Sequence, residues 1–414
     1  MRRRTAGTAR HHRPLSTVVT LASVGLLLVG CTAAGKAGEA DSASGKDAKG
    51  QSVKVGLVYS RTGLLADYGK QYRDGFMAGL DYATNGTNKV AGHRIEVTEQ
   101  DDAGDPGKAV SAAKNLIGKG YKVLAGTTDS GVALQMAPLA AQNKVLYISG
   151  PAATDAVTGI NKYTFRSGRQ SYQDILTAGT MLGEAKGKKV TVLAQDSTFG
   201  QANVAAVKAV LGSKGAKVDS VLAPPSATDL TPFARQVKAG GPDLVFVAWA
   251  GSTAPALWTA LDQQGVLGAS KVVTGLAGTA SYPIFGDAGS KVSFLAHYFP
   301  GAGGGNAVEK SMLDSVTKAG GTPDLFTPDG FTAAQMVVRA VEEGGADSAA
   351  MVKALEGWSF DGVKGKEQVR AEDHALVQPM FVAKLKGKGA GARPELVSTE
   401  AMDKVAPPAT PSAG

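Results

Sequence analysis

Residues 124–154, LAGTTDSGVALQMAPLAAQNKVLYISGPAAT, contain the pattern that decides the fold. A short apolar run at residues 121–125 predicts a buried strand, and it ends in a turn of small and polar residues at 126–131. A helical stretch follows at residues 132–142, with Pro138 as an expected break or kink. The order strand, turn, helix is typical of α/β proteins.

The same pattern begins again directly after this helix. Residues 145–148 predict a second buried strand, which ends in the turn SGPAAT at residues 149–154. In open α/β sheets, ligands bind outside the carboxyl ends of the strands, and a helix that begins there offers free N–H groups to a carboxylate. The two turns therefore predict either a carboxylate site or two ordinary strand-to-helix loops, which also need Gly and Ser to turn.

Strand-like and helical stretches alternate along the chain, which favours parallel, doubly wound sheets. The alternation restarts after residues 165–167, so two similar α/β lobes are the simplest interpretation. The expected strands are residues 53–59, 94–99, 122–125 and 145–148, then 189–194, 218–223, 244–249 and 271–275. The expected helices between them are residues 72–83, 106–119 and 132–142, then 173–186, 203–212, 230–239 and 254–264.

The composition indicates a mostly globular chain with little net charge. Its 414 residues are 43% hydrophobic and 19% charged, and this length is sufficient for two domains. The net charge is +8, but five arginines precede residue 31, where there is no acid, so the remainder carries about +3. The rest of the chain has no basic cluster interleaved with aromatic residues, so we expect no nucleic-acid partner.

Sequence motifs for catalysis, metal binding and cofactor binding are missing. The histidines beyond the N-terminal region are His93, His297 and His374, which are far apart and have no H-E-x-x-H spacing. The chain has no G-x-S-x-G motif, no P-loop, and no G-x-G-x-x-G after its first strand. We therefore expect a protein that is not an enzyme, with no catalytic residue, no metal and no cofactor.

The N-terminus has the pattern of a bacterial export signal. A basic segment is followed by an apolar run at residues 18–30, which is too short to span a membrane comfortably. The run ends in LVGC at residues 28–31, which resembles a bacterial lipobox, and Cys31 is the only cysteine of the chain. We expect residues 1–30 to be a lipoprotein signal peptide, Cys31 to be lipidated and residues 31–51 to be a flexible tether. An incidental cysteine after a spanning helix is the alternative.

Several motifs, in the same order and spacing, resemble the leucine/isoleucine/valine-type periplasmic binding proteins, the type 1 solute-binding family. The two turns of residues 124–154 resemble the amino-acid-binding half-site of that family. The other matching segments are VKVGL at 53–57, TG at 62–63 with YG at 68–69, EQDDAGDP at 99–106, and DSTFG at 196–200. The resemblance covers residues 53–385.

The resemblance implies an α/β fold of two doubly wound parallel-sheet lobes, joined by a three-segment hinge that permits closure around a ligand. We expect lobe 1 at residues 52–168 and 299–358, lobe 2 at residues 169–298 and 359–386, and a disordered tail at 387–414. The chain crossings are expected near residues 167–171, 298–301 and 360–365.

The resemblance also implies a set of ligand-binding residues. Hydroxyl groups and backbone N–H groups of lobe 1 hold the ligand carboxylate in this family, and aromatic side chains line the pocket and close over it. In this sequence the carboxylate clamp corresponds to Ser130, Gly131, Ala152, Ala153 and Thr154, and the aromatic residues correspond to Tyr68, Phe199 and Trp249.

The sequence departs from the family at the position that binds the ligand ammonium. Amino-acid binders carry an acid in the loop after the strand at residues 271–275, but Ala277 stands there in this chain. An ammonium buried without a counter-charge costs several kcal/mol. Asp129 is a substitute acid, although it is also placed to cap the following helix. We therefore expect a ligand that need not be an α-amino acid, such as a non-amino carboxylate or a small amide.

These observations predict the substrate-binding lipoprotein of an ABC importer, which captures a small, amino-acid-like solute with a carboxylate or amide group. Its expected partners are this solute, ABC permease subunits, and the outer face of the cytoplasmic membrane through a lipid on Cys31. We expect a monomer. The alternative is a ligand-sensing subunit that presents the same two lobes to a membrane receptor.

Overall fold

The computed structural model describes residue 50, residues 52–387 and residues 389–410. The chain divides into Met1–Lys46 and Asp47–Gly414, and every described residue belongs to the second unit. The expected signal peptide, the lipidation site at Cys31 and all of the expected tether except residue 50 lie outside the described residues. Within the described part, no helix is long and apolar enough to cross a membrane.

Lobe 1 is built on a six-stranded sheet in the order β2-β3-β1-β4-β5-β6. All of its strands are parallel except β2, which pairs antiparallel with β3. The strands are β1 (Val53–Tyr59), β2 (Lys89–Val90), β3 (His93–Asp101), β4 (Val123–Ala125), β5 (Leu146–Ser149) and β6 (Thr164–Arg166). The helices are α1 (Ala66–Ala83), α2 (Pro106–Gly118), α3 (Ser130–Gln142), α9 (Ala307–Lys318), α10 (Thr327–Gly344) and α11 (Ser348–Leu355), with a 3₁₀ turn at Asp155–Val157.

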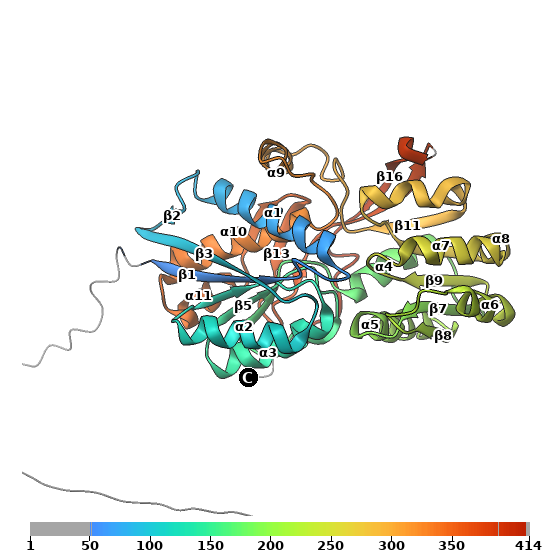
Figure 1. Cartoon of the computed structure of the whole chain (residues 1–414), viewed down its shortest axis with the longest axis horizontal. Coiled ribbons are helices and arrows are strands. Elements are labelled where there is room, and N and C mark those ends of the chain that lie inside the picture. The colour runs from blue at the N-terminus through green and yellow to red at the C-terminus, as the bar shows by residue number, and fades with distance from the viewer. Residues whose placement is uncertain (1–49, 51, 388, 411–414) are drawn as a thin grey trace, which may run out of the picture. The chain divides into compact units, whose positions relative to one another are not determined.

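Helices cover both faces of this sheet because successive strand residues point to opposite faces. Val123 and Ala125 of β4 pack in one core with α1, α10 and α11, whereas Leu124 packs in another with α2 and α3. The same division is visible in Figure 1, where α2 and α3 lie below the sheet and α1 and α10 lie above it. Continuous apolar strands such as 121–125 are therefore explained by burial on both faces.

Lobe 2 repeats this plan with a seven-stranded sheet in the order β16-β15-β11-β10-β9-β7-β8. The strands are β7 (Lys189–Gln195), β8 (Lys217–Ala223), β9 (Leu244–Ala248), β10 (Lys271–Gly275), β11 (Val292–Ala296), β15 (Met380–Lys386) and β16 (Arg393–Glu400), the last two antiparallel. The helices are α4 (Ser171–Leu182), α5 (Thr198–Val207) with a π-helical turn (Lys208–Gly212), α6 (Thr231–Gly240), α7 (Ala254–Gln263) and α8 (Val266–Ala269). Two 3₁₀ segments, Thr279–Lys291 and Gly389–Gly391, complete the lobe. The predicted fold class, two doubly wound α/β lobes, is confirmed.

The expectation that residues 359–386 belong to lobe 2 was wrong for the strands up to residue 377. Strands β12 (Ser359–Gly362), β13 (Gly365–Val369) and β14 (Leu376–Val377) form a small sheet whose apolar residues belong to the core of lobe 1. Only β15 joins lobe 2, so the third crossing follows β14 and does not lie at residues 360–365. Gly362 pairs with Gly365 across a tight hairpin, and the sequence analysis mistook these turn glycines for a crossing.

The expected disordered tail was wrong for the residues described up to 410. Strand β16 pairs with β15 along its whole length, and residues 401–410, which we call the C-terminal strap, return to lobe 1. Val405 of the strap is fully buried, Arg370 Nη1 donates to Pro407 O at 2.8 Å, and Thr410 N donates to Asp373 Oδ2 at 3.0 Å. The sequence did not reveal β16 because this edge strand is mostly exposed and has no apolar alternation.

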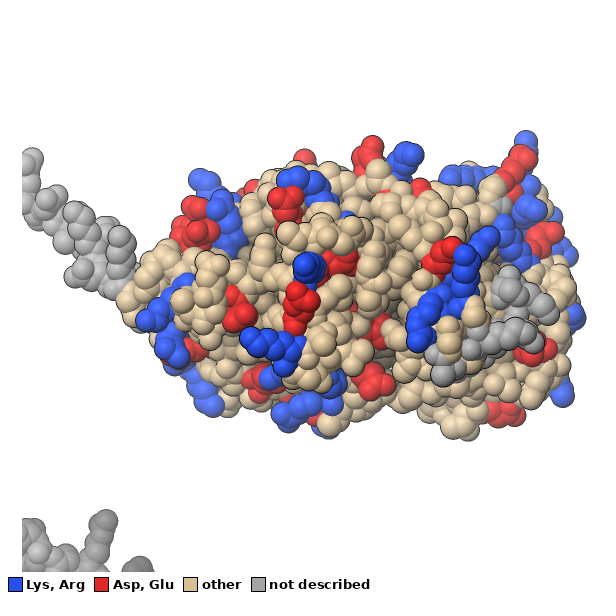
Figure 2. All heavy atoms as spheres, turned by 90° about the horizontal axis from the view of Figure 1, so that it is seen from above, with Lys and Arg blue, Asp and Glu red and all other residues tan. Residues whose placement is uncertain are grey.

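Charged side chains of both signs are interspersed on the surface of the described body. Figure 2 shows one face, on which blue and red side chains alternate over both lobes. This mixed surface is consistent with the small net charge expected beyond the N-terminal arginines.

Candidate functional site

A cavity of about 350 Å³ lies between the two lobes, at the carboxyl ends of the parallel strands. The loops after β1, β4 and β5 supply its lobe 1 wall, and the loops after β7, β9 and β10 supply its lobe 2 wall. This is the place where open α/β sheets bind ligands. The turns of residues 124–154 therefore contribute to a site that two lobes share.

The structure places six of the predicted ligand-binding residues on the wall of this cavity and three outside it. The six are Tyr68, Ser130, Ala153, Phe199, Trp249 and Ala277. Gly131, Ala152 and Thr154 do not line it, and their backbone N–H groups bond within the protein: to Asp129 Oδ1 at 2.7 Å, Thr127 O at 3.3 Å and Ser130 Oγ at 3.3 Å, respectively. These three residues shape the loops, and their part in ligand binding stays a prediction.

Two hydroxyl groups remain at the start of α3, where the helix dipole is positive. Ser130 Oγ accepts the N–H of Thr154, so its own O–H is left to donate. Thr128 lines the cavity, and its buried Oγ1 has no hydrogen-bond partner within the described part of the chain. Asp129 caps the helix by accepting from Gly131 N and Val132 N at 2.7 and 3.0 Å. Together, Thr128 and Ser130 are suited to a carboxylate.

A buried arginine holds the loop after β5 in place. Arg166, at the end of β6, is 1% exposed, and burial lowers its pKa to about 10. Its Nη1 donates to Thr154 O at 2.8 Å, and its Nη2 donates to Ala152 O at 2.6 Å and to Arg169 O at 2.8 Å. One guanidinium therefore fixes the ligand loop to the first chain crossing.

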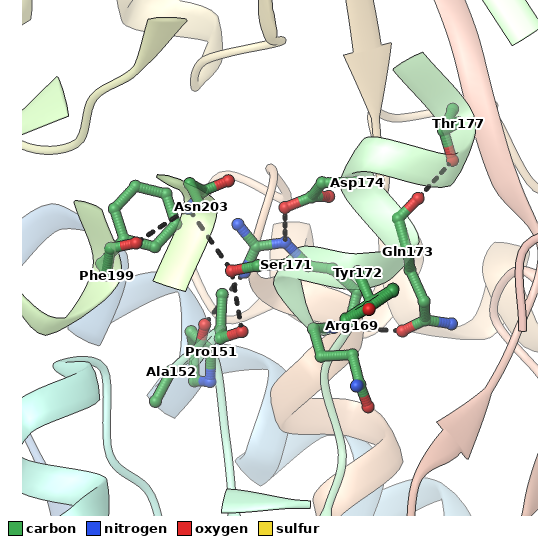
Figure 3. Close-up of polar contacts among 12 residues, drawn as sticks. Pro151, Ala152, Arg169, Ser171, Tyr172, Gln173, Asp174, Thr177, Phe199 and Asn203 are labelled. Carbon is green, nitrogen blue, oxygen red and sulfur yellow. Dashed lines mark hydrogen bonds and ion pairs between the residues drawn. The ribbon is translucent and has the colours of Figure 1, made fainter. Parts of the chain in front are cut away.

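Three charged or titratable residues at the crossings also line the cavity, and the sequence analysis missed all of them. We call Arg169, Asp174 and His297 the hinge-side polar group; each is more than nine-tenths buried. Arg169 Nε lies 3.3 Å from Asp174 Oδ2, as Figure 3 shows, and Arg169 Nη1 donates to Pro151 O at 3.0 Å. A signal for Arg169 and Asp174 was available in the sequence, because both are charged and lie beside an expected crossing. Charged residues are seldom buried in a segment with a purely structural role.

Burial sets the protonation of this group. It raises the pKa of Asp174 to about 6, against the opposing effect of the Arg169 charge. It lowers the pKa of His297 well below its usual value, and the charges of Arg169 and Lys364 add to this effect. His297 is therefore a neutral imidazole at physiological pH.

Aromatic side chains form much of the remaining wall. The Phe326 ring lies beside Tyr68 and His297, with ring centroids 4.7 and 4.9 Å apart, and the Arg169 guanidinium lies 5.6 Å from its centroid. Trp249 Nε1 donates to Thr253 Oγ1 at 3.0 Å, so its N–H is already bonded within lobe 2. The wall therefore favours a flat, apolar ligand body.

The loop that carries Ala277 offers no acid to a ligand. Asp324, which contacts this loop, accepts from Thr279 N at 2.7 Å, Thr279 Oγ1 at 3.1 Å and Leu325 N at 2.8 Å, and it is not part of the cavity wall. The acids on the wall are Asp129, which caps α3, and Asp174, which pairs with Arg169. In the described residues, no group of three or more His, Cys, Asp or Glu side chains is arranged to hold a metal ion.

Comparisons with known proteins agree with this geometry. The family model for periplasmic binding proteins matches residues 52–390. The Leu/Ile/Val-binding protein homolog 3 of Brucella melitensis is 25% identical over 310 residues, which cover 73% of this chain and 83% of the relative.

Two solved structures from Rhodopseudomonas palustris show the same fold. An ABC-type branched-chain amino acid transporter protein is 32% identical with a TM-score of 0.69, covering 85% of this chain and 97% of that one. A solute-binding protein of an ABC transporter in complex with 3,4-dihydroxybenzoic acid is 25% identical with a TM-score of 0.74, covering 85% of this chain and 98% of that one.

Replacing Arg166 with methionine should strongly destabilise the protein. Arg166→Met keeps a long apolar stem but leaves the carbonyls of Ala152, Thr154 and Arg169 without their donor. We expect the free energy of unfolding to fall by about 3 kcal/mol, measured by urea denaturation. The exposed Arg94→Met is the matched control and should change it by less than about 0.5 kcal/mol. Equal effects of the two substitutions would contradict this role of Arg166.

The stability of the protein should carry a signature of Asp174 between pH 4 and pH 6. The pKa of Asp174 is 3.8 in an ordinary environment and about 6 in the fold, so in this range the folded state binds the extra proton. Its contribution therefore makes the protein less stable as pH rises, by at most about 3 kcal/mol. Residue 174 does not titrate in the Asp174→Asn variant. The melting temperature of the variant minus that of the unsubstituted protein should therefore increase from pH 4 to pH 7. A difference that is independent of pH would show that burial does not raise this pKa.

Proposed function

Because this chain belongs to the periplasmic binding protein family, we propose that it is the substrate-capturing subunit of an ABC importer for a small carboxylate without an α-amino group. As a member of this family it acts outside the cytoplasm, binds a small solute, and is not an enzyme. The two lobes close over the solute and present it to permease subunits in the membrane.

The observation that carries the proposal is the combination of free hydroxyls at the start of α3 with a loop that lacks an acid at Ala277. Thr128 and Ser130 are placed to donate to a carboxylate, and their helix N-terminus favours negative charge. Arg169, whose charge is paired with that of Asp174, holds one of the same loops, because its Nη1 donates to Pro151 O at 3.0 Å.

An ammonium group has no equivalent partner. Ala277 offers no charge, and Asp324 already accepts three hydrogen bonds. An ammonium beside Asp174 would also lie close to the Arg169 guanidinium, and like charges in a buried site repel strongly. A non-amino carboxylate or a small amide avoids both costs.

The aromatic wall narrows the class of solute further. Tyr68, Phe199, Trp249 and Phe326 favour a solute with a flat apolar body. The similar protein that was solved with 3,4-dihydroxybenzoic acid shows that relatives at this level of identity bind aromatic carboxylates. Aromatic carboxylates are therefore the first solutes to test.

The membrane attachment that we propose uses the N-terminal cysteine. Cys31 follows the apolar run at residues 18–30 in the LVGC sequence, and no other cysteine is present. Lipid on Cys31 would keep the binding protein near its permease, because acyl chains partition into the bilayer.

Lipid attachment at Cys31 predicts a labelled product that one substitution removes. Cells that express the full chain with radiolabelled palmitate should give a labelled protein in the membrane fraction. Cys31→Ala should abolish the label and leave the protein uncleaved. Label retained by Cys31→Ala would disprove this attachment.

The proposed solute class predicts a specific response to an acid at position 277. A soluble chain that begins near residue 51 should show a rise in melting temperature with benzoate-type carboxylates and none with leucine, isoleucine or valine. At one hundred times the dissociation constant, a solute adds about 2.7 kcal/mol of stability, which such a screen detects.

Ala277→Glu should weaken carboxylate binding about tenfold or more, because it places another anion on the cavity wall.

Ala349→Glu, at an exposed position of α11, is the matched control and should leave binding unchanged. If leucine, isoleucine or valine stabilised the unsubstituted chain and benzoates did not, the proposed solute class would be wrong.

A further inference from the structure

The hinge-side polar group holds two atoms that the fold does not use. Asp174 Oδ1 and His297 Nε2 are buried and have no hydrogen-bond partner within the described residues, whereas Arg169 Nε lies 3.3 Å from Asp174 Oδ2. Their residues all line the cavity. Buried polar atoms without partners are costly to retain, so two beside one cavity point to a ligand.

The three residues come together only because the chain crosses between the lobes. Arg169 and Asp174 flank the start of α4, directly after the first crossing, and His297 follows β11 at the second crossing. The Phe326 ring packs against both Arg169 and His297. The group is thus fixed at the hinge, where it keeps its geometry when the lobes close.

The charges of this group select against ions. Arg169 and Asp174 form an ion pair at 3.3 Å, so their charges largely cancel. His297 is neutral because burial and the neighbouring cations lower its pKa. A second carboxylate would meet Asp174, and an ammonium would meet Arg169. A neutral group that both donates and accepts hydrogen bonds fits both free atoms.

We propose that Arg169, Asp174 and His297 form a subsite for a hydroxyl group of the solute. The solute O–H donates to Asp174 Oδ1, which the Arg169 ion pair orients, and its oxygen accepts from the Nε2–H tautomer of the His297 imidazole. The inference rests on the proposed function, since the carboxylate of the same solute lies at Thr128 and Ser130. The chain thus selects hydroxylated, apolar carboxylates over their unsubstituted counterparts.

The test compares solutes that share a ring and a carboxylate but differ in this one group. Dissociation constants for benzoate, 3- and 4-hydroxybenzoate and their methyl ethers are measured by calorimetry on the chain from residue 51. One hydroxybenzoate should bind about tenfold or more tightly than benzoate, because benzoate lacks the hydroxyl group and leaves buried polar atoms unpaired. Its methyl ether cannot donate to Asp174 and should lose this advantage.

Asp174→Asn tests the assignment of the acceptor. Its amide oxygen faces Arg169, so its NH₂ replaces the acceptor on the cavity side. The preference for hydroxybenzoate over its methyl ether should fall to about threefold or less. Asp361→Asn, at an exposed position with its carboxylate paired to Lys366, is the matched control and should keep the full preference.

The outcomes separate this inference from the proposed function. Equal affinity for benzoate and both hydroxybenzoates would overturn the subsite while the carboxylate function stands. A preference that Asp174→Asn leaves intact would also overturn it. Binding of branched-chain amino acids without any benzoate would overturn the proposed function and the subsite together. If Asp174→Asn does not fold, the comparison of hydroxybenzoate with its ether in the unsubstituted chain decides.

Discussion

The contact between the Arg166 guanidinium and three backbone carbonyls is the constraint on which the binding site depends. Removing a charge from water costs several kcal/mol, and Arg166 is almost completely buried. Its bonds to Ala152 O, Thr154 O and Arg169 O offset this cost and join the loop after β5 to the first crossing. Asp155 adds a nearby negative charge. Arg166 therefore joins the ligand loop directly to the start of the first crossing.

The other links between the lobes are packed around the same point. Gly168, within the first crossing, approaches Asp329 so closely that a Cβ would lie 2.6 Å from Oδ2, which excludes larger residues. Lys364 Nζ pairs with Asp329 Oδ1 at 3.4 Å and with Gln378 Oε1 at 2.5 Å, beside the third crossing. The C-terminal strap adds a fourth connection from β16 to lobe 1. The crossings are therefore polar and buried, and they carry the ion pairs Arg169–Asp174 and Lys364–Asp329.

The fold could be predicted from sequence because its determinants are local. Apolar strand runs and helical periodicity fix the βα alternation, and strands such as β1 and β4 are apolar along most of their length because helices cover both faces. The errors arose where local pattern is ambiguous. The hairpin glycines at 362 and 365 resemble a crossing, and β16 is held by backbone pairing without an apolar face.

The sequence identified only those residues of the cavity wall that lie in contiguous motifs. Ser130, Ala153 and Tyr68 lie in stretches whose order identifies them, and the structure places them on the cavity. Arg169 and His297 are far apart in sequence and meet only at the hinge, so no spacing rule connects them.

Buried polar atoms without partners discriminate between solutes better at a hinge than on a mobile loop. A solute that cannot bond to such atoms binds weakly, because its binding leaves each of them desolvated and unpaired. An apolar wall discriminates only weakly between solutes of similar shape. In the proposed function the aromatic residues of this cavity supply affinity, and the lack of an acid at Ala277 disfavours amino-acid ligands. Selectivity among carboxylates then comes from Asp174 and His297, the wall residues at the hinge with polar atoms that the fold leaves unpaired.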